Sequence, residues 1–389
     1  MTVCDLTHAY HETSGGIRTY IDAKRRYVLE NTDHTHVLVV PGSEDRVERG
    51  ERWATYWIKS PLIPGAAPYR FLLRRGAMVE ALGAARPDVV ELNSLYREPS
   101  AAFEYRRRHP GAVVSGYYFT DLPSAYVRPA AEAVAGQWAA GHAERWAERY
   151  VRSTFDHCNL VCAPSPAQAE RLTRIGVEDV HIVVPGVDLE TFHPARASNT
   201  VRADLSVPGG AVFAVYVGRL DSEKRTATMV EAVRLANETA PVVLVLAGNG
   251  PHRPALEEAQ AEGAAIRVLP YQDNRDQLAR LLASADVYLT AGPHETFGLS
   301  VVEAQACGLP VVGVEAGALV ERVPPTVGRL GPVDDAAAMA ANLLWVAARR
   351  DALGPAARRH VEEQFSWAAS FETLFALYRE ALGRPAPPA

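Results

Sequence analysis

Short apolar runs that alternate with helix-length segments constrain the fold of this chain more than any other feature of its sequence. One series lies at 36–40, 88–92, 112–115, 160–163 and 181–184, and a second lies at 212–217, 242–247, 265–269, 287–290 and 311–314. Near-continuous apolar strands separated by helices are typical of parallel sheets that helices cover on both faces. The pattern therefore predicts an α/β protein with two Rossmann-like, doubly wound domains.

The length of 389 residues fits two domains of ordinary size. A break is expected where Pro185 and Gly186 precede a polar, featureless stretch. We expect an N-terminal domain over 1–190 and a C-terminal domain over 191–366. A helix over 367–383 should cross back to the first domain, and the proline-rich segment 384–389 should be a disordered tail.

Composition excludes several classes of protein. A formal net charge of -6 argues against nucleic-acid binding, which requires a basic excess. No apolar run approaches the roughly 20 residues that span a bilayer, and no signal peptide precedes the first expected strand at 3–6, so a cytoplasmic location is expected. Four cysteines are too few for a disulfide framework. Cys158 and Cys162 are expected in one buried strand, with no second pair to complete a zinc site.

The strongest signal for a ligand site follows the expected strand 287–290. A turn that contains Gly298 leads into a helix that ends at Gly308. The free N–H groups and the dipole at the start of such a helix suit an anion such as a diphosphate. Glu303 lies on the first turns and would repel phosphate, so we expect it to face a hydroxylated group such as a ribose. One such turn alone is more often a plain strand–helix connection.

A second cluster follows another expected strand of the same domain. Arg219 and Lys224 lie five residues apart at the end of the strand 212–217, before a helix. Arginine can clamp a phosphate with two hydrogen bonds, and lysine supplies a point charge. A lone pair of this kind is usually a solvated surface. Two strand-end clusters in one domain, one cationic and one rich in glycine, together favour a diphosphate site.

These motifs resemble the signatures of family 4 glycosyltransferases. The first motif is Gly218-Arg219-Leu220 followed by Lys224, and the second is the pair Glu295 and Glu303, which seven residues separate. The other three are the segments 306–312, 185–194 and 14–20. The resemblance runs nearly end to end in consistent order, and bacterial α-mannosyltransferases resemble the chain most, at 16–20 and 36–42. It implies the GT-B fold, in which two Rossmann-like domains face a cleft. It also implies transfer of a sugar from a nucleotide diphosphate sugar to an acceptor, with retention, apparently by same-face attack within an ion pair, to form an α-glycoside.

The resemblance also implies roles for individual residues. Arg219 and Lys224 would grip the diphosphate, and Glu295 would hold hydroxyls of the donor sugar. Glu303 would bind the ribose. The main-chain N–H groups of Phe297, Gly298 and Leu299 would contact the phosphate or the sugar. Gly15, Gly16 and Gly218 are also expected at the donor, and at Gly15 and Gly16 the missing Cβ would let the backbone approach the diphosphate closely.

The family resembled here needs no metal and no cofactor beyond its donor substrate. The chain contains no Asp-x-Asp motif, which would supply the carboxylate pair that holds a divalent ion. We therefore expect Arg219, Lys224 and helix dipoles to neutralise the charge of the leaving diphosphate.

One residue departs from the family pattern. Phe119 stands where the family usually has a histidine, which contacts the donor sugar near its 6-hydroxyl, while the main-chain carbonyl lies near the anomeric carbon. Phe119 can keep only the main-chain role. Three interpretations stay open: His8 or Tyr118 compensates, the donor lacks a 6-hydroxyl, or activity has been lost.

Other candidates have weaker support. His8 and His11 flank the first glycine turn and could contact the acceptor, although histidines in exposed loops are common. Asp121 could orient substrate or cap a turn. The basic segments 70–75 and 106–108 could rest on anionic lipid at the inner face of the membrane. Such patterns more often belong to a helix with one face in solvent and the other packed on the core.

Two other classes of protein remain as alternatives. A non-hydrolysing sugar-nucleotide epimerase has a similar fold, but it would need acidic and histidine groups around the donor. A transferase that has lost activity and serves as a binding protein is suggested only by Phe119. The sequence leaves open the base, the sugar, the acceptor (a glycan, a lipid or a small natural product) and the oligomeric state.

Overall fold

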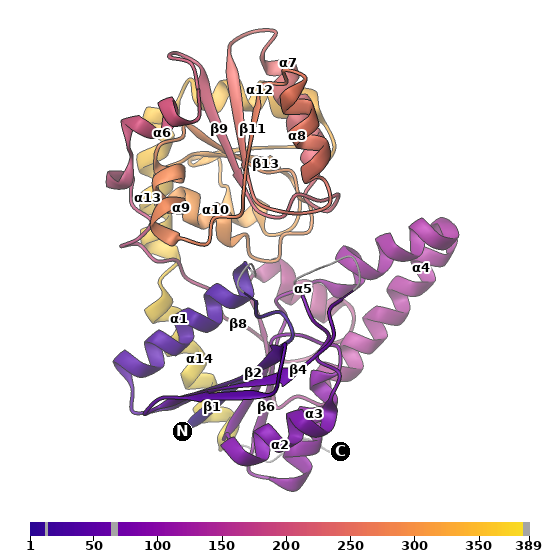
Figure 1. The fold of residues 1–389 in the computed structure, drawn as a ribbon. Helices are drawn as coiled ribbons and strands as arrows, with labels where there is room; N and C mark the ends of the chain where they lie inside the picture. The colour runs from indigo at the N-terminus through magenta and orange to yellow at the C-terminus, as the bar shows by residue number, and fades with distance from the viewer. Residues whose placement is uncertain (12–14, 64–68, 384–389) are drawn as a thin grey trace. The chain divides into compact units, whose positions relative to one another are not determined.

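A computed structural model describes residues 1–11, 15–63 and 69–383 and divides the chain into two compact units (Figure 1). Unit 1 comprises Met1–Val184 with Ala368–Ala389, and unit 2 comprises Pro185–Trp367. The first break therefore comes a few residues before the expected boundary at 190. The expected tail 384–389 lies outside the described residues.

Unit 1 is built on an eight-stranded sheet. Its strands are β1 (Thr2–Leu6), β2 (Thr35–Gly42), β3 (Arg46–Arg49), β4 (Trp53–Lys59), β5 (Val89–Leu92), β6 (Val113–Tyr117), β7 (Leu160–Ala163) and β8 (Val180–Ile182). Their order is β3-β4-β2-β1-β5-β6-β7-β8, and the pairing is parallel except between β3 and β4. The expected strands correspond to β1, β2 and β5 to β8. The edge strand β3 and its neighbour β4 were not predicted, because charged residues fill the exposed β3 and β4 is only partly buried.

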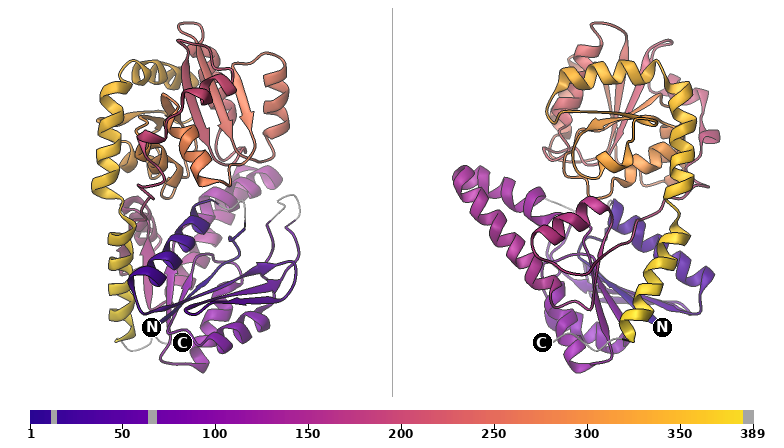
Figure 2. Two further views of the ribbon diagram at one scale, coloured as in Figure 1. Left: turned by 60° about the vertical axis from the view of Figure 1, so that its left-hand side comes forward. Right: turned by 180° about the vertical axis from the view of Figure 1, so that it is seen from behind.

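Helices flank this sheet on both faces (Figure 2). They are α1 (Gly16–Asn31), α2 (Arg75–Ala85), α3 (Glu98–Arg108), the π-helical turn η1 (Pro123–Val127), α4 (Arg128–Phe155), α5 (Pro166–Arg174) and the C-terminal α14 (Trp367–Leu382). Nearly all of α14 thus belongs to unit 1 although unit 2 precedes it in sequence.

The α4 segment is a hairpin of two helical rods. Gly136 has φ 77° and ψ 178°, which is far from helical and favours glycine. Residues 16 apart in a straight helix are separated by about 24 Å, yet Arg128 Nη1 donates to Glu144 Oε2 over 3.0 Å. The chain therefore doubles back at Gly136, and the rods extend away from the sheet of unit 1 (Figures 1 and 2).

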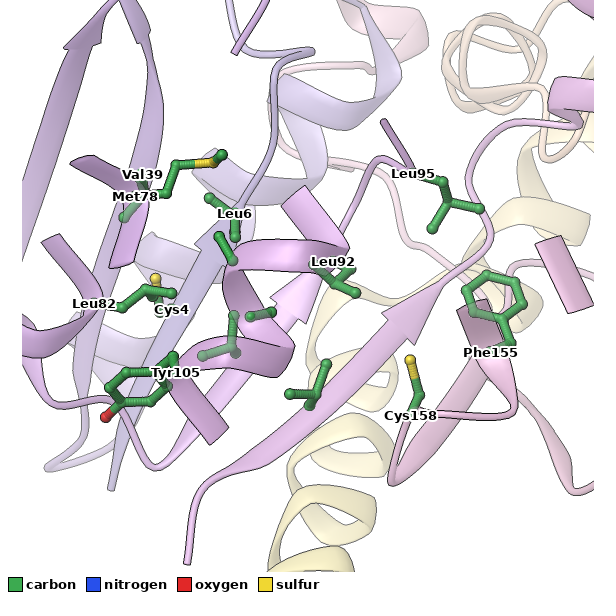
Figure 3. Packing of buried hydrophobic residues seen from close by; sticks show 14 of the residues in the cluster. Cys4, Leu6, Val39, Met78, Leu82, Leu92, Leu95, Tyr105, Phe155 and Cys158 are labelled. Carbon is green, nitrogen blue, oxygen red and sulfur yellow. The ribbon is translucent and has the colours of Figure 1, made fainter. Parts of the chain in front are cut away.

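The apolar core of unit 1 lies between the central strands and helices α2 and α3 (Figure 3). Leu6, Leu82 and Leu92 are fully buried there. Cys158 is buried but lies between α4 and β7, so the expectation that it shares a strand with Cys162 is wrong. Asn159, which separates it from β7, does not continue an apolar run, because its side-chain oxygen accepts a hydrogen bond from Val114 N over 3.0 Å. Both thiols are free, and burial raises the pKa of Cys158 to about 12.

A buried network of charges crosses the centre of unit 1. Lys24 Nζ of α1 donates to Asp5 Oδ1 of β1 and to Glu91 Oε1 of β5, each over 2.7 Å. All three side chains are completely buried. Burial alone would lower the pKa of Lys24, but the two carboxylates raise it, so the ammonium stays charged.

Hydroxyl and imidazole groups complete this network. His36 Nε2 lies 2.7 Å from Asp5 Oδ2, and the Tyr20 hydroxyl donates to Glu91 Oε1 over 3.0 Å. The Tyr378 hydroxyl of α14 donates to the other oxygen of Glu91. The network therefore joins α1, β1, β2, β5 and the C-terminal helix.

Unit 2 is built on a six-stranded, wholly parallel sheet. Its strands are β9 (Val212–Val217), β10 (Val242–Ala247), β11 (Ile266–Leu269), β12 (Val287–Leu289), β13 (Val311–Val314) and β14 (Gly328–Gly331), in the order β11-β10-β9-β12-β13-β14. The five expected strands correspond to β9 to β13. Only β14 was not predicted, because it contains two glycines, an arginine and a single apolar residue.

Helices again cover both faces of this sheet. They are α6 (Asn199–Asp204), α7 (Thr226–Ala236), α8 (Arg253–Ala261), α9 (Arg275–Ala283), α10 (Leu299–Ala306), α11 (Leu319–Arg322), α12 (Ala336–Ala347) and α13 (Arg350–Gln364), with a 3-10 turn at Pro194–Arg196. Both units are therefore doubly wound, as the sequence predicts.

Each sheet has a point where the strand order reverses. The chain leaves β9 toward β10 on one side and returns to β12 on the other, so β9 and β12 are neighbours. In unit 1, β1 has the same position between β2 and β5. Ligands of open α/β sheets bind outside the carboxyl ends of the strands at such reversals.

Replacing Lys24 by methionine should destabilise unit 1 by about 3–5 kcal/mol, because it leaves two buried carboxylates without their counter-ion. Denaturant unfolding followed by tryptophan fluorescence would measure the change, since Trp53 and Trp57 lie in β4. Arg234→Ala, which removes an exposed cation from α7, is the matched control and should leave the midpoint unchanged. An unchanged midpoint for Lys24→Met would contradict the prediction.

Candidate active site

The loops that follow β9 and β12 meet at the strand-order reversal of unit 2. Lys224, in the first loop, donates from Nζ to Oε1 of Glu295, in the second, over 2.5 Å. The two side chains are 13% and 18% exposed, so the pair is shielded but still reachable by a ligand. The residues that the sequence selected from two separate motifs are therefore in direct contact.

Local packing and hydrogen bonds fix the loop after β9. A Cβ on Gly248, at the end of β10, would lie 1.9 Å from the carbonyl oxygen of Gly218, so the two backbones can approach only with glycine there. The Tyr216 hydroxyl donates to the carbonyl of Arg219 over 3.0 Å. Lys224 N donates to Asp221 Oδ1 over 3.1 Å, which closes the turn before α7.

Carboxylates surround the two cations of this loop. Arg219 contacts Asp221 Oδ2 over 2.6 Å and also pairs with Glu223. Lys224 lies 3.2 Å from Glu223 and is shared with Glu295. Burial would lower the pKa of Lys224, but Glu295 and Glu223 raise it well above its usual range. An incoming diphosphate would therefore meet fixed, fully charged donors and would compete with carboxylates for them.

The loop after β12 ends in the predicted turn and helix. Gly298 has φ 80° and ψ 51°, a left-handed conformation that favours glycine, and α10 begins directly after it. Two hydrogen bonds hold the loop from behind: Ala318 N donates to the carbonyl of Glu295 over 2.8 Å, and Arg322 Nε donates to the carbonyl of Phe297 over 3.1 Å. The start of α10, at Leu299, is thus rigidly supported.

Glu303 is a buried carboxylate on the first turns of α10. Its side chain is 5% exposed, and Nη2 of Arg275 lies 2.8 Å from Oε1. Burial raises the pKa of Glu303, and the charge of Arg275 opposes that effect. A buried carboxylate has several lone pairs, so a single cation leaves acceptor positions that suit a hydroxyl group of a ligand.

Arg275 is a residue that sequence reasoning missed. It begins α9, and its guanidinium also lies over the ring of Phe192, 4.6 Å from the centroid. No motif or spacing connects Arg275 with Glu303, because the contact arises only from the packing of α9 beside α10. A buried carboxylate needs a counter-ion, so a cation near Glu303 could have been expected. That rule does not identify Arg275 among the arginines of the chain.

The first glycine turn of unit 1 precedes α1. Added Cβ atoms on Gly15 and Gly16 would have no neighbour within 4 Å. Nothing in the described chain therefore demands glycine there, which is consistent with space kept for another molecule. Ser14, the first residue of this motif, lies outside the described residues.

The histidines of the first loop have different surroundings. His8 Nδ1 lies 2.9 Å from Glu98 Oε1, and the imidazole meets the ring of Tyr96 edge-on. Burial would raise the pKa of Glu98, but the bond to His8 lowers it below its usual value. His11 has its ring 6.2 Å from that of Tyr69, whereas His8 contacts Glu98 and Tyr96.

Phe119 belongs to an aromatic cluster at the end of β6. Its ring stacks on Tyr117 with centroids 4.0 Å apart and lies 4.7 Å from Tyr20. The neighbouring Tyr118 is buried and donates its hydroxyl to Asp121 Oδ1 over 3.0 Å. That hydroxyl is therefore engaged inside unit 1, which disfavours Tyr118 as the replacement for the missing histidine.

Asp121 has an evident structural role. Its Oδ2 lies 2.7 Å from Nε of Arg171 on α5, and its main-chain carbonyl accepts from Ala125 N. Ser124 N also approaches Oδ1 at 3.4 Å. These contacts favour the interpretation that Asp121 caps the turn into η1.

The sequence of this chain matches a family of known proteins. The sequence matches the profile of the family described as Glycosyltransferase Family 4 over residues 14–191, and that of Glycosyl transferases group 1 over residues 198–360. A GDP-mannose-dependent alpha-(1-6)-phosphatidylinositol dimannoside mannosyltransferase from Mycobacterium tuberculosis is 33% identical over 82% of this chain and 81% of its own. A GDP-mannose-dependent alpha-mannosyltransferase from Mycolicibacterium smegmatis is 28% identical over 92% of this chain and 91% of its own.

Solved structures agree on the fold. Sucrose-phosphate synthase from Thermosynechococcus elongatus superposes with a TM-score of 0.78 at 21% identity, covering 98% of this chain and 99% of that chain. Anabaena HepE in complex with UDP-glucose superposes with a TM-score of 0.74 at 16% identity, covering 98% of this chain and 100% of that chain.

The chain belongs to the family 4 glycosyltransferases and has the GT-B fold. It is a retaining glycosyltransferase that takes its sugar from a nucleotide sugar. The resemblance stated from the sequence is thereby confirmed, and the relatives give no support to the epimerase alternative. Within the described ranges no three His, Cys, Asp or Glu side chains gather as metal ligands would, and no helix there is long and apolar enough to cross a membrane.

Arg275→Ala should weaken binding of GDP about tenfold or more at pH 7, because Glu303 loses the cation that keeps it ionised. The affinity should fall as the pH drops through the pKa of Glu303. In the variant this fall should begin at a higher pH, since the pKa is raised further. Isothermal titration calorimetry at pH 7 and at successively lower pH would measure both effects.

The control is Arg280→Ala, which removes the same charge from an exposed position of the same helix. It should bind GDP like the unaltered protein at every pH. Equal loss of affinity in the two variants would show that the general charge of α9, and not the Arg275–Glu303 contact, is responsible.

Proposed function

We propose that this protein is a mannosyltransferase that uses GDP-mannose and forms an α-mannoside on a lipid acceptor of the phosphatidylinositol mannoside type. The observation that carries the proposal is the contact between Lys224 and Glu295 at the strand-order reversal, since it joins a diphosphate-binding cation to a sugar-binding carboxylate. The named activities of the two mycobacterial relatives supply the donor, and that of the first supplies the acceptor class.

The chemistry requires stabilisation of the departing diphosphate. When the bond between the anomeric carbon and the phosphate oxygen breaks, negative charge accumulates on the diphosphate. Arg219 and Lys224 would meet this charge, together with the N–H groups at the start of α10, around Leu299. The acceptor hydroxyl attacks from the face that the leaving group vacates, which retains the α configuration.

Lys224 would thereby serve two partners. Its bond to Glu295 orients that carboxylate, leaving the second oxygen for hydroxyls of the mannose, while its charge acts on the diphosphate. Glu303 would accept hydrogen bonds from the ribose, with Arg275 as its positioning residue. A single strand-end surface of unit 2 can in this way hold all three parts of the donor.

The donor proposed here has a 6-hydroxyl, which bears on Phe119. The ring of Phe119 packs against Tyr117 and Tyr20, so we assign it a structural role and keep only its main-chain carbonyl near the anomeric carbon. Of the two compensating groups considered from the sequence, His8 fits better than Tyr118, whose hydroxyl bonds to Asp121. Gly15 and Gly16 would allow close approach of the diphosphate, and His11 stays a candidate for acceptor contact.

Arg219→Ala and Lys224→Ala should each reduce kcat by about 10²–10³, the usual effect of removing one preorganised donor from developing charge. Transfer from GDP-mannose to a detergent-solubilised phosphatidylinositol mannoside would measure it. Arg234→Ala, on the exposed face of α7, is the control and should keep full activity. Near-normal turnover of both site variants, with thermal unfolding unchanged, would refute the assignment.

The unaltered enzyme should use GDP-mannose with a higher kcat/KM than GDP-6-deoxymannose, by about two- to tenfold, because one hydrogen bond to the 6-hydroxyl is worth about 0.5–1.5 kcal/mol. The two donors differ only at C6, so the ratio isolates that position. A preference for the deoxy sugar would instead support the interpretation that Phe119 marks a donor without a 6-hydroxyl. No transfer from any nucleotide sugar would support the binding-protein alternative.

A further inference from the structure

The α4 hairpin carries the most exposed large apolar side chains of the described chain. Val134 is 89% exposed and Trp138 is 79% exposed, on either side of the turn at Gly136. Trp146 and Tyr126, farther from the turn, are 61% and 41% exposed. Exposed apolar side chains that gather on one projecting element mark an interaction surface.

Charge is almost absent from the end of this hairpin, which we call the hairpin tip and define as residues 129–143. Glu132 is its only Asp, Glu, Lys or Arg, and the other residues are mainly alanine and glycine. The ion pair between Arg128 and Glu144 marks the level where charged residues begin again. The hairpin is therefore apolar at its end and charged toward its base.

The dimensions of the hairpin tip match the outer layer of a bilayer. Gly136 comes eight positions after Arg128, which corresponds to about 12 Å of helical rod. Interfacial helices bury about 5–10 Å in the boundary between headgroups and acyl chains. Tryptophan prefers this boundary, because its ring is apolar while its N–H can still reach water.

A second copy of the chain is a poorer occupant for the same surface. A stable protein interface buries about 800 Å² on each partner. The hairpin tip offers two large side chains, Val134 and Trp138, and a tryptophan buries at most about 250 Å². The alanines beside them add little area, so the tip falls well short of a stable dimer.

The basic segments considered from the sequence fit a membrane less well. Arg74 pairs with Asp45, and Arg75 and Arg108 both pair with Glu104. Arg106 is buried and donates to the carbonyl of His157. Their charges are thus largely neutralised within unit 1. Segment 70–75 is also not a helix that could lie on lipid, since α2 begins only at Arg75.

We infer that the hairpin tip inserts into the interfacial layer of a lipid bilayer and anchors the enzyme beside its lipid acceptor. The choice of a bilayer rests on the proposed function, because a lipid acceptor places the substrate in that layer. Apolar insertion, unlike attraction to anionic headgroups, needs no negative lipid and resists salt. Glu132 would even favour a neutral surface over an anionic one.

The test is co-sedimentation of the full chain with phosphatidylcholine vesicles in 0.1 M and 0.5 M NaCl. The unaltered protein should bind at both salt concentrations. The double variant Val134→Asp with Trp138→Ser should bind at least about tenfold more weakly, because it removes two apolar side chains from the inserted region. The control is Val320→Asp, which adds the same charge at a position of unit 2 that is 57% exposed, and its binding should be unchanged.

Three outcomes would overturn the inference: no binding by the unaltered protein, equal binding by the double variant, or loss of binding at high salt. A dimer in light scattering that the double variant converts to a monomer would assign the tip to a second copy instead. Mannose transfer to a detergent-solubilised lipid acceptor separates this test from the proposed function. If transfer fails while vesicle binding holds, the proposed function is wrong and the anchor is not.

Discussion

The ammonium group of Lys24, enclosed between Asp5 and Glu91, is the interaction on which unit 1 depends. A buried charge is tolerated only with partners, so every element that supplies a partner has its position fixed by this one group. The same network reaches the end of β6, because Tyr20 donates to Glu91 while its ring packs against Phe119. The turn that contains Phe119 is therefore supported from the centre of the fold.

Unit 2 uses the same principle at its surface, with a different result. Its cations are also held by carboxylates, but Arg219 is 41% exposed and pairs with Asp221 and Glu223 of its own loop. Such pairs keep the guanidinium in place before a ligand arrives, at the cost of some competition with the ligand. Unit 1 uses enclosed charges to fix its elements, whereas the charges of this loop in unit 2 are partly exposed. Partial exposure suits the diphosphate-binding role that we propose for them.

The sequence predicted what depends on local pattern, and it missed what depends on packing between elements. Apolar runs located the central strands. Their positions at strand ends singled out Arg219, Lys224 and Glu303, and the resemblance to the family added Glu295. The edge strand β3 and its neighbour β4 lack a buried apolar run, and β14 is half glycine. The partnership of Arg275 with Glu303 joins α9 to α10, and no local pattern records it. The α4 hairpin was also not predicted, because a single glycine among alanines does not indicate that the chain reverses direction there.

The placement of α14 has a consequence for the way the protein is made. Unit 1 is discontinuous in sequence, and the hydroxyl of Tyr378 that completes the Glu91 site is synthesised only after all of unit 2. The N-terminal sheet must therefore leave the ribosome with a gap where the last helix will bind, while unit 2, which is continuous, can complete its own core during translation. A chain truncated before α14 would keep every residue discussed for the active site and still lack part of the domain that supports it.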